Sequence, residues 1–370
     1  MRIFLGLCLI VLSSAQGFAA QDFDLSTCSI SAERDGKPAA ITCAGTTFTI
    51  DDTDDGIEFS NVINGLALQL WQDRRYNLAD ALFRSALDIR RRVLGEDHPD
   101  TATSYKNFAL NLDSQGRFDQ GEPFLRKALE IRKRSFGENH VDTIRLKGHL
   151  ALNLDFQGRY ADAEPLLSQV LETQRRVLGE DDHLTAVSYH NLASNLDRQG
   201  RYAEAEPFYR KGLDIKLRVL DADDTSTAAT YSSFALSLTA QGRYAEADKL
   251  NRKALEIQLR GFGEDHPSTA RSYTNTAYNL TLQGMYAEAD PFNRKALEIR
   301  LRILGEGHVD TATSYFNLAY NLTSLSRYEE AEIFYRKAVS SFERALGKDH
   351  PTTKKAVERV SYIIESEHHK

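Results

Sequence analysis

The sequence contains little cysteine and no long apolar run. Only three of its 370 residues are cysteines, namely Cys8, Cys28 and Cys43. The apolar stretch at residues 3–12 has ten residues, which is too few to cross a bilayer core about 30 Å thick. We therefore expect no membrane insertion by this segment.

The sequence also lacks a basic patch. Its formal net charge is −7, and lysine and arginine are interspersed with aspartate and glutamate. A protein that binds nucleic acid needs clustered cations to displace the counterions of the phosphate backbone. We therefore expect no nucleic-acid partner.

The first residues carry the pattern of a secretory signal peptide. Arg2 precedes the apolar stretch, and small residues up to Ala19 and Ala20 follow it, as is typical of a cleavable leader. We expect residues 1–19 to be removed on export, which would make the mature protein periplasmic or secreted. Cys8 lies within this leader and does not match a lipoprotein cleavage site, so no lipid anchor is expected.

Residues 20–58 predict a small module of short strands. An Asp35-Gly36 bend separates segments rich in isoleucine and threonine, a pattern that favours strands joined by turns. Since an exported protein enters an oxidising compartment, we expect Cys28 and Cys43 to form a disulfide. Such a bond would contribute about 3 kcal/mol by the loop-entropy relation. The alternative is a cytosolic protein with two free thiols.

The rest of the chain repeats with a period of 42 residues. One series of alanines recurs seven times at this step, and two further series of small residues keep it as well. A fixed period of this length indicates a solenoid, in which each repeat contacts only its neighbours. The first series is Ala67, Ala109, Ala151, Ala193, Ala235, Ala277 and Ala319.

Each repeat contains two helical patterns. Tyr105, Phe108 and Leu112 are apolar at the spacing of one helix face, and Gln115 and the glycine after it end this first helix. The second helix is expected from about Phe118 to residue 136, where a glycine suited to a left-handed conformation stops it. The fold is therefore expected to be all-α.

The loops between repeats carry histidine, proline and acids. Pro99 suits the first position of a helix, where the missing N–H costs nothing, and the neighbouring acids complement the helix dipole. His98 and its counterparts occur once in a loop, a whole repeat apart, so they cannot meet at one metal ion. We expect no metal site and no cofactor. The arginines near the ends of the second helices, such as Arg90, are expected to be structural.

These features together resemble the tetratricopeptide repeat. The 42-residue period and the segments at residues 94–101, 160–167 and 202–209 are similar to the kinesin light chain class of these repeats. The resemblance implies a right-handed α-α superhelix with seven repeats over residues 59–350 and a capping helix over residues 351–370. An exported bacterial protein is expected, because such repeats occur in many bacterial proteins unrelated to motor transport and the leader at residues 1–19 excludes a role on kinesin.

The resemblance also implies where a ligand would bind. In this family a stripe on the first helix, here through Thr103 and Asn107, lines a concave groove, and an asparagine in similar proteins grips the backbone of an extended peptide. A carboxamide suits this role because it offers both a donor and an acceptor. The alternative is that these side chains cap or bridge helices. The candidate peptide-binding row is Asn107, His149, Asn191, Ser233, Asn275 and Asn317.

A second asparagine row lies one helical turn further along the first helices. Asparagine is a poor helix former, so its recurrence there implies a hydrogen bond of the side chain. The bond could serve a ligand or the neighbouring repeat, and we favour the neighbouring repeat. The row is Asn111, Asn153, Asn195, Asn279 and Asn321.

Two further positions suggest the chemistry of the partner. Asp113, Asp155 and Asp197 recur in the first full repeats, which predicts an acidic groove there and a partner segment with basic residues. Tyr278 and Tyr320 occur in later repeats and would supply contact area at low entropy cost. The alternative is a solvated acidic face without a ligand.

The leading hypothesis is a protein–protein interaction scaffold that binds an extended or helical segment in its groove. A structural or self-associating spacer is the alternative. An enzyme such as a hydrolase is less favoured, because catalysis needs one asymmetric constellation. His149, His183 and His190 depart from the repeat pattern, but the sequence places no nucleophile beside them.

Overall fold

The structure is a computed structural model that describes residues 29–31, 40–43, 46–49, 55–221 and 223–368. The predicted leader at residues 1–19 and Cys28 lie outside these residues, so the predicted cleavage and disulfide remain predictions.

The described part of the chain contains fifteen helices. They are α2 (Asp55–Gln72), α3 (Tyr76–Leu94), α4 (Pro99–Ser114), α5 (Phe118–Phe136), α6 (Val141–Phe156), α7 (Tyr160–Val177), α8 (His183–Arg198), α9 (Tyr202–Val219), α10 (Thr225–Ala240), α11 (Tyr244–Phe262), α12 (Pro267–Leu282), α13 (Tyr286–Leu304), α14 (Val309–Ser324), α15 (Tyr328–Leu346) and α16 (Pro351–His368). Helices of 16 residues alternate with helices of 18 or 19 residues from α4 to α15. A repeat of one shorter and one longer helix therefore underlies the all-helical part of the chain.

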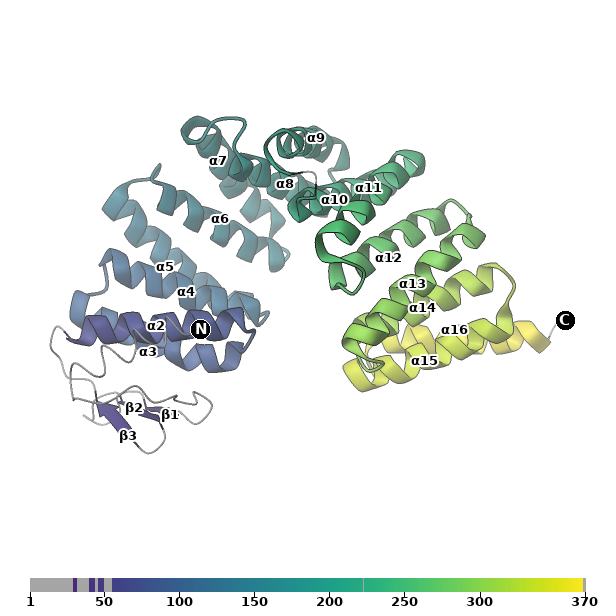
Figure 1. The fold of residues 1–370 in the computed structure, drawn as a ribbon, viewed down its shortest axis with the longest axis horizontal. Helices are drawn as coiled ribbons and strands as arrows, with labels where there is room; N and C mark the ends of the chain where they lie inside the picture. The colour runs from purple at the N-terminus through teal and green to yellow at the C-terminus, as the bar shows by residue number, and fades with distance from the viewer. Residues whose placement is uncertain (1–28, 32–39, 44–45, 50–54, 222, 369–370) are drawn as a thin grey trace. The chain divides into compact units, whose positions relative to one another are not determined.

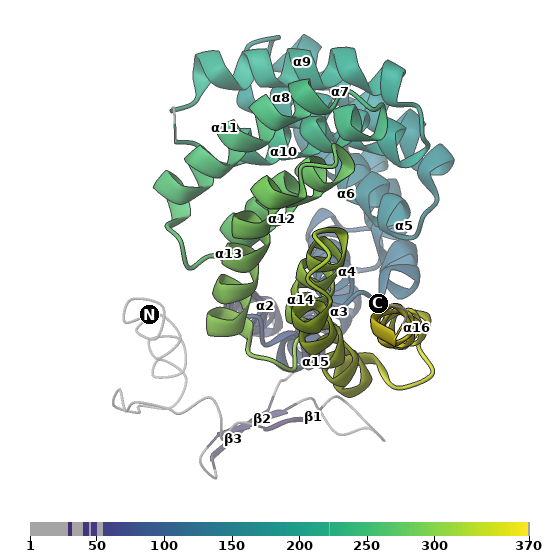
Figure 2. The same ribbon diagram turned by 90° about the vertical axis from the view of Figure 1, so that its right-hand side faces the viewer.

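The helices form two compact units, which we call the N-terminal unit (residues up to 173) and the C-terminal unit (from 174). In the N-terminal unit α2 packs on α3, α3 on α4, α4 on α5 and α5 on α6. In the C-terminal unit the same order of neighbours continues from α8 to α16 (Figures 1 and 2). Each helix therefore packs mainly on the helices next to it in sequence, as in a solenoid.

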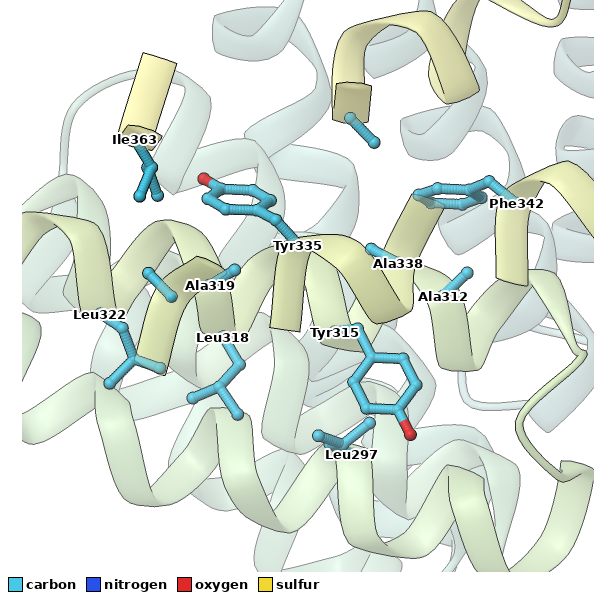
Figure 3. Packing of buried hydrophobic residues seen from close by; sticks show 12 residues of the cluster. Leu297, Ala312, Tyr315, Leu318, Ala319, Leu322, Tyr335, Ala338, Phe342 and Ile363 are labelled. Atoms are coloured by element: carbon cyan, nitrogen blue, oxygen red, sulfur yellow. The ribbon is translucent and has the colours of Figure 1, made fainter. Parts of the chain in front are cut away.

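The recurring alanines lie where helices approach most closely. Ala109 and Ala235 are fully buried, because their small side chains let the helix backbones come together while aromatic and leucine side chains fill the remaining space. Figure 3 shows this packing at the end of the C-terminal unit, where Ala319 and Ala338 lie among larger side chains such as Tyr335. These recurring small residues therefore serve the close packing of the helices.

The loop histidines cap the following helices. His98 Nδ1 accepts a hydrogen bond from the backbone N–H of Asp100 at 3.1 Å, which satisfies a donor that the first turn of α4 leaves free. His140, His266, His308 and His350 cap α6, α12, α14 and α16 in the same way. In α8 the cap is Asp182, whose Oδ1 accepts from the N–H of Leu184 at 2.8 Å. The loop histidines are therefore structural.

The second helices end at glycine, but not in the conformation that we expected. Gly137 has φ 87° and ψ 169°, which is an extended region open almost only to glycine, rather than the left-handed helical region. Where the series has Asp221 in place of glycine, α9 ends at Val219 and Leu220 is extended with φ −117°. The glycine therefore affects the direction of the loop more than the end of the helix, since α7, which is followed by Gly179, ends at Val177, the position equivalent to Val219.

Three short strands precede the helices. β1 (Ser29–Ser31) pairs antiparallel with β2 (Ala40–Cys43), and β2 pairs antiparallel with β3 (Thr46–Thr49). The strand order in this sheet is β1-β2-β3. A strand module linked by a disulfide between Cys28 and Cys43 remains a prediction.

Candidate interaction surface on the first helices

The candidate site is defined by positions in the first helix of each repeat. We number these positions so that the recurring alanine, for example Ala109, is position 8. The side chains at positions 2, 5, 6 and 9 form what we call the first-helix face. Position 10 lies beside them on the same helix and carries the second asparagine row.

The asparagines at position 10 join neighbouring repeats. The side-chain N–H of Asn279 donates to the carbonyl oxygen of Tyr244, the first residue of the preceding second helix, at 3.1 Å. Three other members make the same bond at 2.9 to 3.2 Å: Asn111 to Tyr76, Asn153 to Phe118 and Asn321 to Tyr286. These asparagines are buried, and the bonding between repeats that we favoured is confirmed for them.

The residues at position 6 differ between the two units. In the N-terminal unit Asn107 is only 6% exposed, and its Nδ2 donates to Oδ1 of Asn64 at 2.9 Å. In the C-terminal unit Asn191, Asn275 and Asn317 are partly exposed and make no hydrogen bond to any described residue. Asn107 is therefore used in stacking, contrary to its predicted role. In each of the other three asparagines the side-chain carbonyl oxygen and the side-chain NH2 group both remain available.

The aspartates at position 12 do not line an open acidic face. Asp155 is only 5% exposed. Asp113 Oδ1 accepts from Nδ2 of Asn153 at 2.6 Å, and Asp197 Oδ1 accepts from the hydroxyl of Ser237 at 2.8 Å, so both carboxyls bond to the next repeat. The prediction of an acidic groove at these residues is therefore wrong, because position 12 points toward the neighbouring helices.

Burial also changes the protonation of these aspartates. It raises the pKa of Asp113 and of Asp197 to about 6, against hydrogen bonds that favour the charged form. Tyr209 supplies one of these bonds, since its hydroxyl donates to Oδ2 of Asp197 at 3.0 Å. At neutral pH the ionised form of these two carboxyl groups is therefore only weakly favoured over the protonated form.

Two of the histidines that depart from the pattern are neutral in the fold. Burial, with repulsion from Lys106 and Arg145, lowers the pKa of His149 to about 4. Burial, with repulsion from Lys216, lowers the pKa of His190 to about 4. His190 lies edge-on to the ring of Tyr209 with 5.8 Å between centroids.

Position 9 carries an exposed apolar row in the C-terminal unit. Tyr278 is 52% exposed and Tyr320 is 40% exposed, and their contact with a partner stays a prediction. Leu236 and Tyr362 extend the row at the same 42-residue step and are also exposed. The guanidinium of Arg359 lies 6.0 Å from the ring centroid of Tyr320. Tyr362 was missed from sequence, although its spacing from Tyr320 could have identified it.

Cations near the ends of the second helices bind the next repeat. Nζ of Lys216 donates to the carbonyl of Ser226 and to the hydroxyl of Thr230, both at 2.9 Å, and Arg90 Nη1 donates to the hydroxyl of Ser104 at 2.9 Å. The structural role expected for such cations is confirmed at Arg90.

Among the residues that the structure describes, no helix is long and apolar enough to cross a membrane, and no cluster suited to a metal ion occurs.

A family model and solved structures identify the fold. The tetratricopeptide repeat model matches residues 58–120, 114–175, 145–218, 226–302 and 277–344. The chain belongs to the tetratricopeptide repeat family, whose members are generally non-enzymatic scaffolds for protein–protein interaction. Comparison with curated protein sequences found no match.

Several solved structures are similar to this chain at low sequence identity, two of them with a TM-score above 0.5. The apo form of RapI is 16% identical, with 77% of this chain and 98% of that chain covered and a TM-score of 0.59. A signal-transduction ATPase with a tetratricopeptide repeat sensor from Pyrococcus horikoshii is 15% identical, with 82% and 44% covered and a TM-score of 0.60. A kinesin light chain-like repeat protein from Podosopora anserina is 22% identical, with 55% and 97% covered and a TM-score of 0.49.

Proposed function

We propose that the chain is an exported interaction scaffold that binds an extended or helical segment of a partner protein on its first-helix face. Export is proposed from the leader pattern at residues 1–19. The family supports a scaffold, since tetratricopeptide repeats generally serve protein–protein interaction. The partner segment is proposed to lie in the concave groove that such repeats form.

One contrast between two asparagine rows carries the proposal. The position-10 amides, such as that of Asn279, are buried and bonded between repeats. The position-6 amides of Asn275 and Asn317 lie only four residues earlier on the same helices, yet they are partly exposed and bond to no described residue. A recurring amide that is not needed for stacking is available to a peptide backbone, which offers the complementary donor and acceptor.

The exposed apolar row beside these amides supplies contact area. Tyr278 and Tyr320 lie three residues after Asn275 and Asn317, so each pair shares one helix face. Tyrosine buries a large area for only two rotatable side-chain bonds and keeps a polar end. The combination suits a ligand that presents backbone amides and apolar side chains together.

Selection from a library of random peptides on the immobilised full-length chain tests the proposal. We expect enriched peptides, and we expect the double variant Tyr278→Ser/Tyr320→Ser to lose most of this enrichment. The matched control is Leu217→Ser/Ile333→Ser, which removes two side chains that are 55% and 56% exposed on second helices of the same unit. This control should select the same peptides as the unsubstituted chain.

Two results would count against the proposal. Equal enrichment by the tyrosine variant and by the control would place the contact elsewhere on the molecule. The absence of any enriched peptide, together with oligomers that grow with concentration on size-exclusion chromatography, would favour the self-associating spacer.

A further inference from the structure

One junction in the C-terminal unit carries polar residues where the others carry apolar ones. We call the packing of a second helix on the following first helix a junction. At the junction of α9 and α10 the ring of Tyr209 stacks on that of Phe234, with 5.6 Å between centroids. At the junction of α11 and α12 the equivalent residues are both polar. The pairs along the chain are Phe83 with Phe108, Leu125 with Leu150, Leu167 with Leu192, Tyr209 with Phe234, Asn251 with Thr276, Asn293 with Leu318, and Tyr335 with Val360.

Both polar side chains of this junction are buried. Asn251 is 1% exposed, and Thr276 is fully buried. Neither the side-chain oxygen nor the side-chain nitrogen of Asn251 has a hydrogen-bond partner among the described residues. The hydroxyl of Thr276 donates to the carbonyl of Ser272 on its own helix at 3.0 Å, so its proton is not available to α11. A buried amide without a partner raises the free energy of the packed state, and water can bond to it once the helices part.

The residue at position 251 also makes none of the contacts of its equivalent on α9. The hydroxyl of Tyr209 donates to Oδ2 of Asp197 at 3.0 Å. In the next repeat the equivalent of Asp197 is Thr239, and Asn251 bonds to no described residue. The side chain on α11 therefore supplies neither the ring contact nor the hydrogen bond that Tyr209 supplies on α9.

Two apolar clusters of the C-terminal unit exclude α12. One cluster lies on α10 and α11 and consists of Ala228, Tyr231, Ala254 and Ile257. The larger cluster of Figure 3 extends from α13 to α16. Neither of these clusters includes a residue of α12. The stability of a repeat array is approximately a sum of repeat terms and nearest-neighbour interface terms, so the array opens first at its weakest interface.

We propose that the junction of α11 and α12 is a joint, at which these two helices part reversibly while the repeats on either side stay folded. The joint lies beside the candidate interaction surface, since Thr276 follows Asn275 directly and precedes Tyr278 by two residues on α12. Opening changes the spacing between the first-helix faces of α10 and α12, and so fits that surface to segments of different shape. The joint is a property of the chain without a partner and does not depend on the proposed function.

Hydrogen exchange of the full-length chain without a partner, followed by mass spectrometry of its peptides, tests the joint. Parted helices lose the packing that stabilises them, so their backbone amides exchange faster. After correction for intrinsic rates, we expect peptides from α11 and α12 to exchange about tenfold or more faster than those from α9 and α10. They should also exchange faster than peptides from α14 and α15, which separates a joint from fraying that spreads from the end of the chain.

Two double variants give this junction the apolar pair of another junction. Asn251→Leu/Thr276→Leu introduces the pair found at Leu125 and Leu150, both of which are buried. We expect it to slow exchange in α11 and α12 about tenfold or more and to leave α9 and α10 unchanged. Asn251→Tyr/Thr276→Phe introduces the aromatic pair of the junction of α9 and α10 and should act in the same direction if the leucines do not pack.

The matched control adds two leucines to the surface of the same two helices. Glu256 on α11 and Arg271 on α12 are both exposed. Glu256→Leu/Arg271→Leu should therefore leave exchange in α11 and α12 as fast as in the unsubstituted chain, because it adds no apolar contact within the junction.

Two results would overturn the inference. Exchange in α11 and α12 of the unsubstituted chain that is no faster than in α9 and α10 would show that the junction stays closed, and this comparison needs no substitution. Fast exchange that neither apolar pair slows would show that Asn251 and Thr276 do not cause the opening. Neither result affects the selection of peptides that depends on Tyr278 and Tyr320, so the joint and the proposed function can fail separately.

Discussion

The two units carry the same repeat but present different chemistry at equivalent positions. In the N-terminal unit Asn107 at position 6 is buried against the preceding repeat, and the exposed groups nearby include cations such as Arg145. In the C-terminal unit Asn275 at position 6 is partly exposed and unbonded among described residues, and Tyr278 at position 9 is 52% exposed. The repeat fixes the stacking in both units, while the first-helix face varies.

This difference indicates which positions are free to change. Position 8 is a buried alanine in both units, and position 10 bonds to the preceding repeat in both. Position 5 is Lys106 in the N-terminal unit and Thr274 in the C-terminal unit, and position 9 is Leu110 in one and Tyr278 in the other. Position 6 is asparagine in both Asn107 and Asn275, but only Asn107 bonds to the preceding repeat among the described residues, because stacking does not depend on this position in every repeat. The first-helix face can therefore vary between repeats without loss of the stacking.

The largest expected effect concerns the buried alanine at position 8, which the two units share. Ala109→Leu in the N-terminal unit and Ala235→Leu in the C-terminal unit should each lower the free energy of unfolding by about 2–3 kcal/mol, because added methylenes force packed helices apart. Urea unfolding followed by circular dichroism measures this. Ala203→Leu, at an exposed position of α9, is the control. A loss no larger than that of the control would mean that position 8 does not set the helix spacing.

The next effect separates the two asparagine rows within one helix. Asn279→Ala should lower the free energy of unfolding by about 2 kcal/mol, because it leaves the carbonyl of Tyr244 without this partner in the interior. Asn275→Ala should change it by less than about 0.5 kcal/mol. Thermal or urea unfolding of both variants measures these changes. Equal losses of unfolding free energy would mean that the position-6 and position-10 asparagines do not differ in their contribution to stacking.

A pH profile tests the buried histidine of the C-terminal unit. The pKa of His190 is about 4 in the fold and 6.5 in its unperturbed state. The folded state therefore binds fewer protons than the unfolded state between these values, and this contribution to stability is lost as pH falls from about 6.5 toward 4. Through His190 the parent should lose about 1–2 kcal/mol of its free energy of unfolding between pH 7 and pH 5. His190→Gln should not show this loss.

The comparison between variant and parent is needed because other groups act in the opposite direction. The raised pKa of Asp113 and of Asp197, about 6 against 3.8, makes their contribution more favourable as pH falls toward 4. Urea unfolding of parent and variant at several pH values isolates the histidine. Parallel profiles for the two proteins would show that His190 is not the group responsible.

The smallest expected effect concerns turns inside the first and last repeats. Arg74 and Ser326 have φ of 60° and 59°, at positions where the other repeats have glycine, such as Gly242. Because a left-handed conformation strains residues with a side chain, Arg74→Gly and Ser326→Gly should each raise the free energy of unfolding by up to about 1 kcal/mol. Gly242→Ser should lower it by a similar amount. A lower stability of both glycine variants would contradict this reading of the turns.

Much of the fold could be predicted from sequence because its signals recur. The second helix expected from about Phe118 to residue 136 is observed as α5 (Phe118–Phe136), since tyrosine or phenylalanine starts it and glycine stops it in nearly every repeat. The bonding of the position-10 asparagines between repeats was also predictable, because one local pattern repeats with one geometry, whereas the capping role of the loop histidines was not predicted.

The site could be predicted only in part. Whether an aspartate at position 12 faces solvent depends on a partner 40 residues away, as in the bond between Asp113 and Asn153. The grouping of Lys106, Arg132 and Arg145 around one small cavity could not be predicted, because these residues come from three helices and follow no single repeat position. Such contacts between repeats require the three-dimensional arrangement.

The central claim is that a partner contacts the first helices at the side chains that stacking leaves free. It is tested most directly by placing a photoreactive residue at Asn275 or, as a control, at Glu256, an exposed residue of α11, and irradiating each protein with a selected peptide. The account predicts that the peptide is captured from the Asn275 site and not from Glu256. Capture from Glu256 without capture from Asn275 would contradict it.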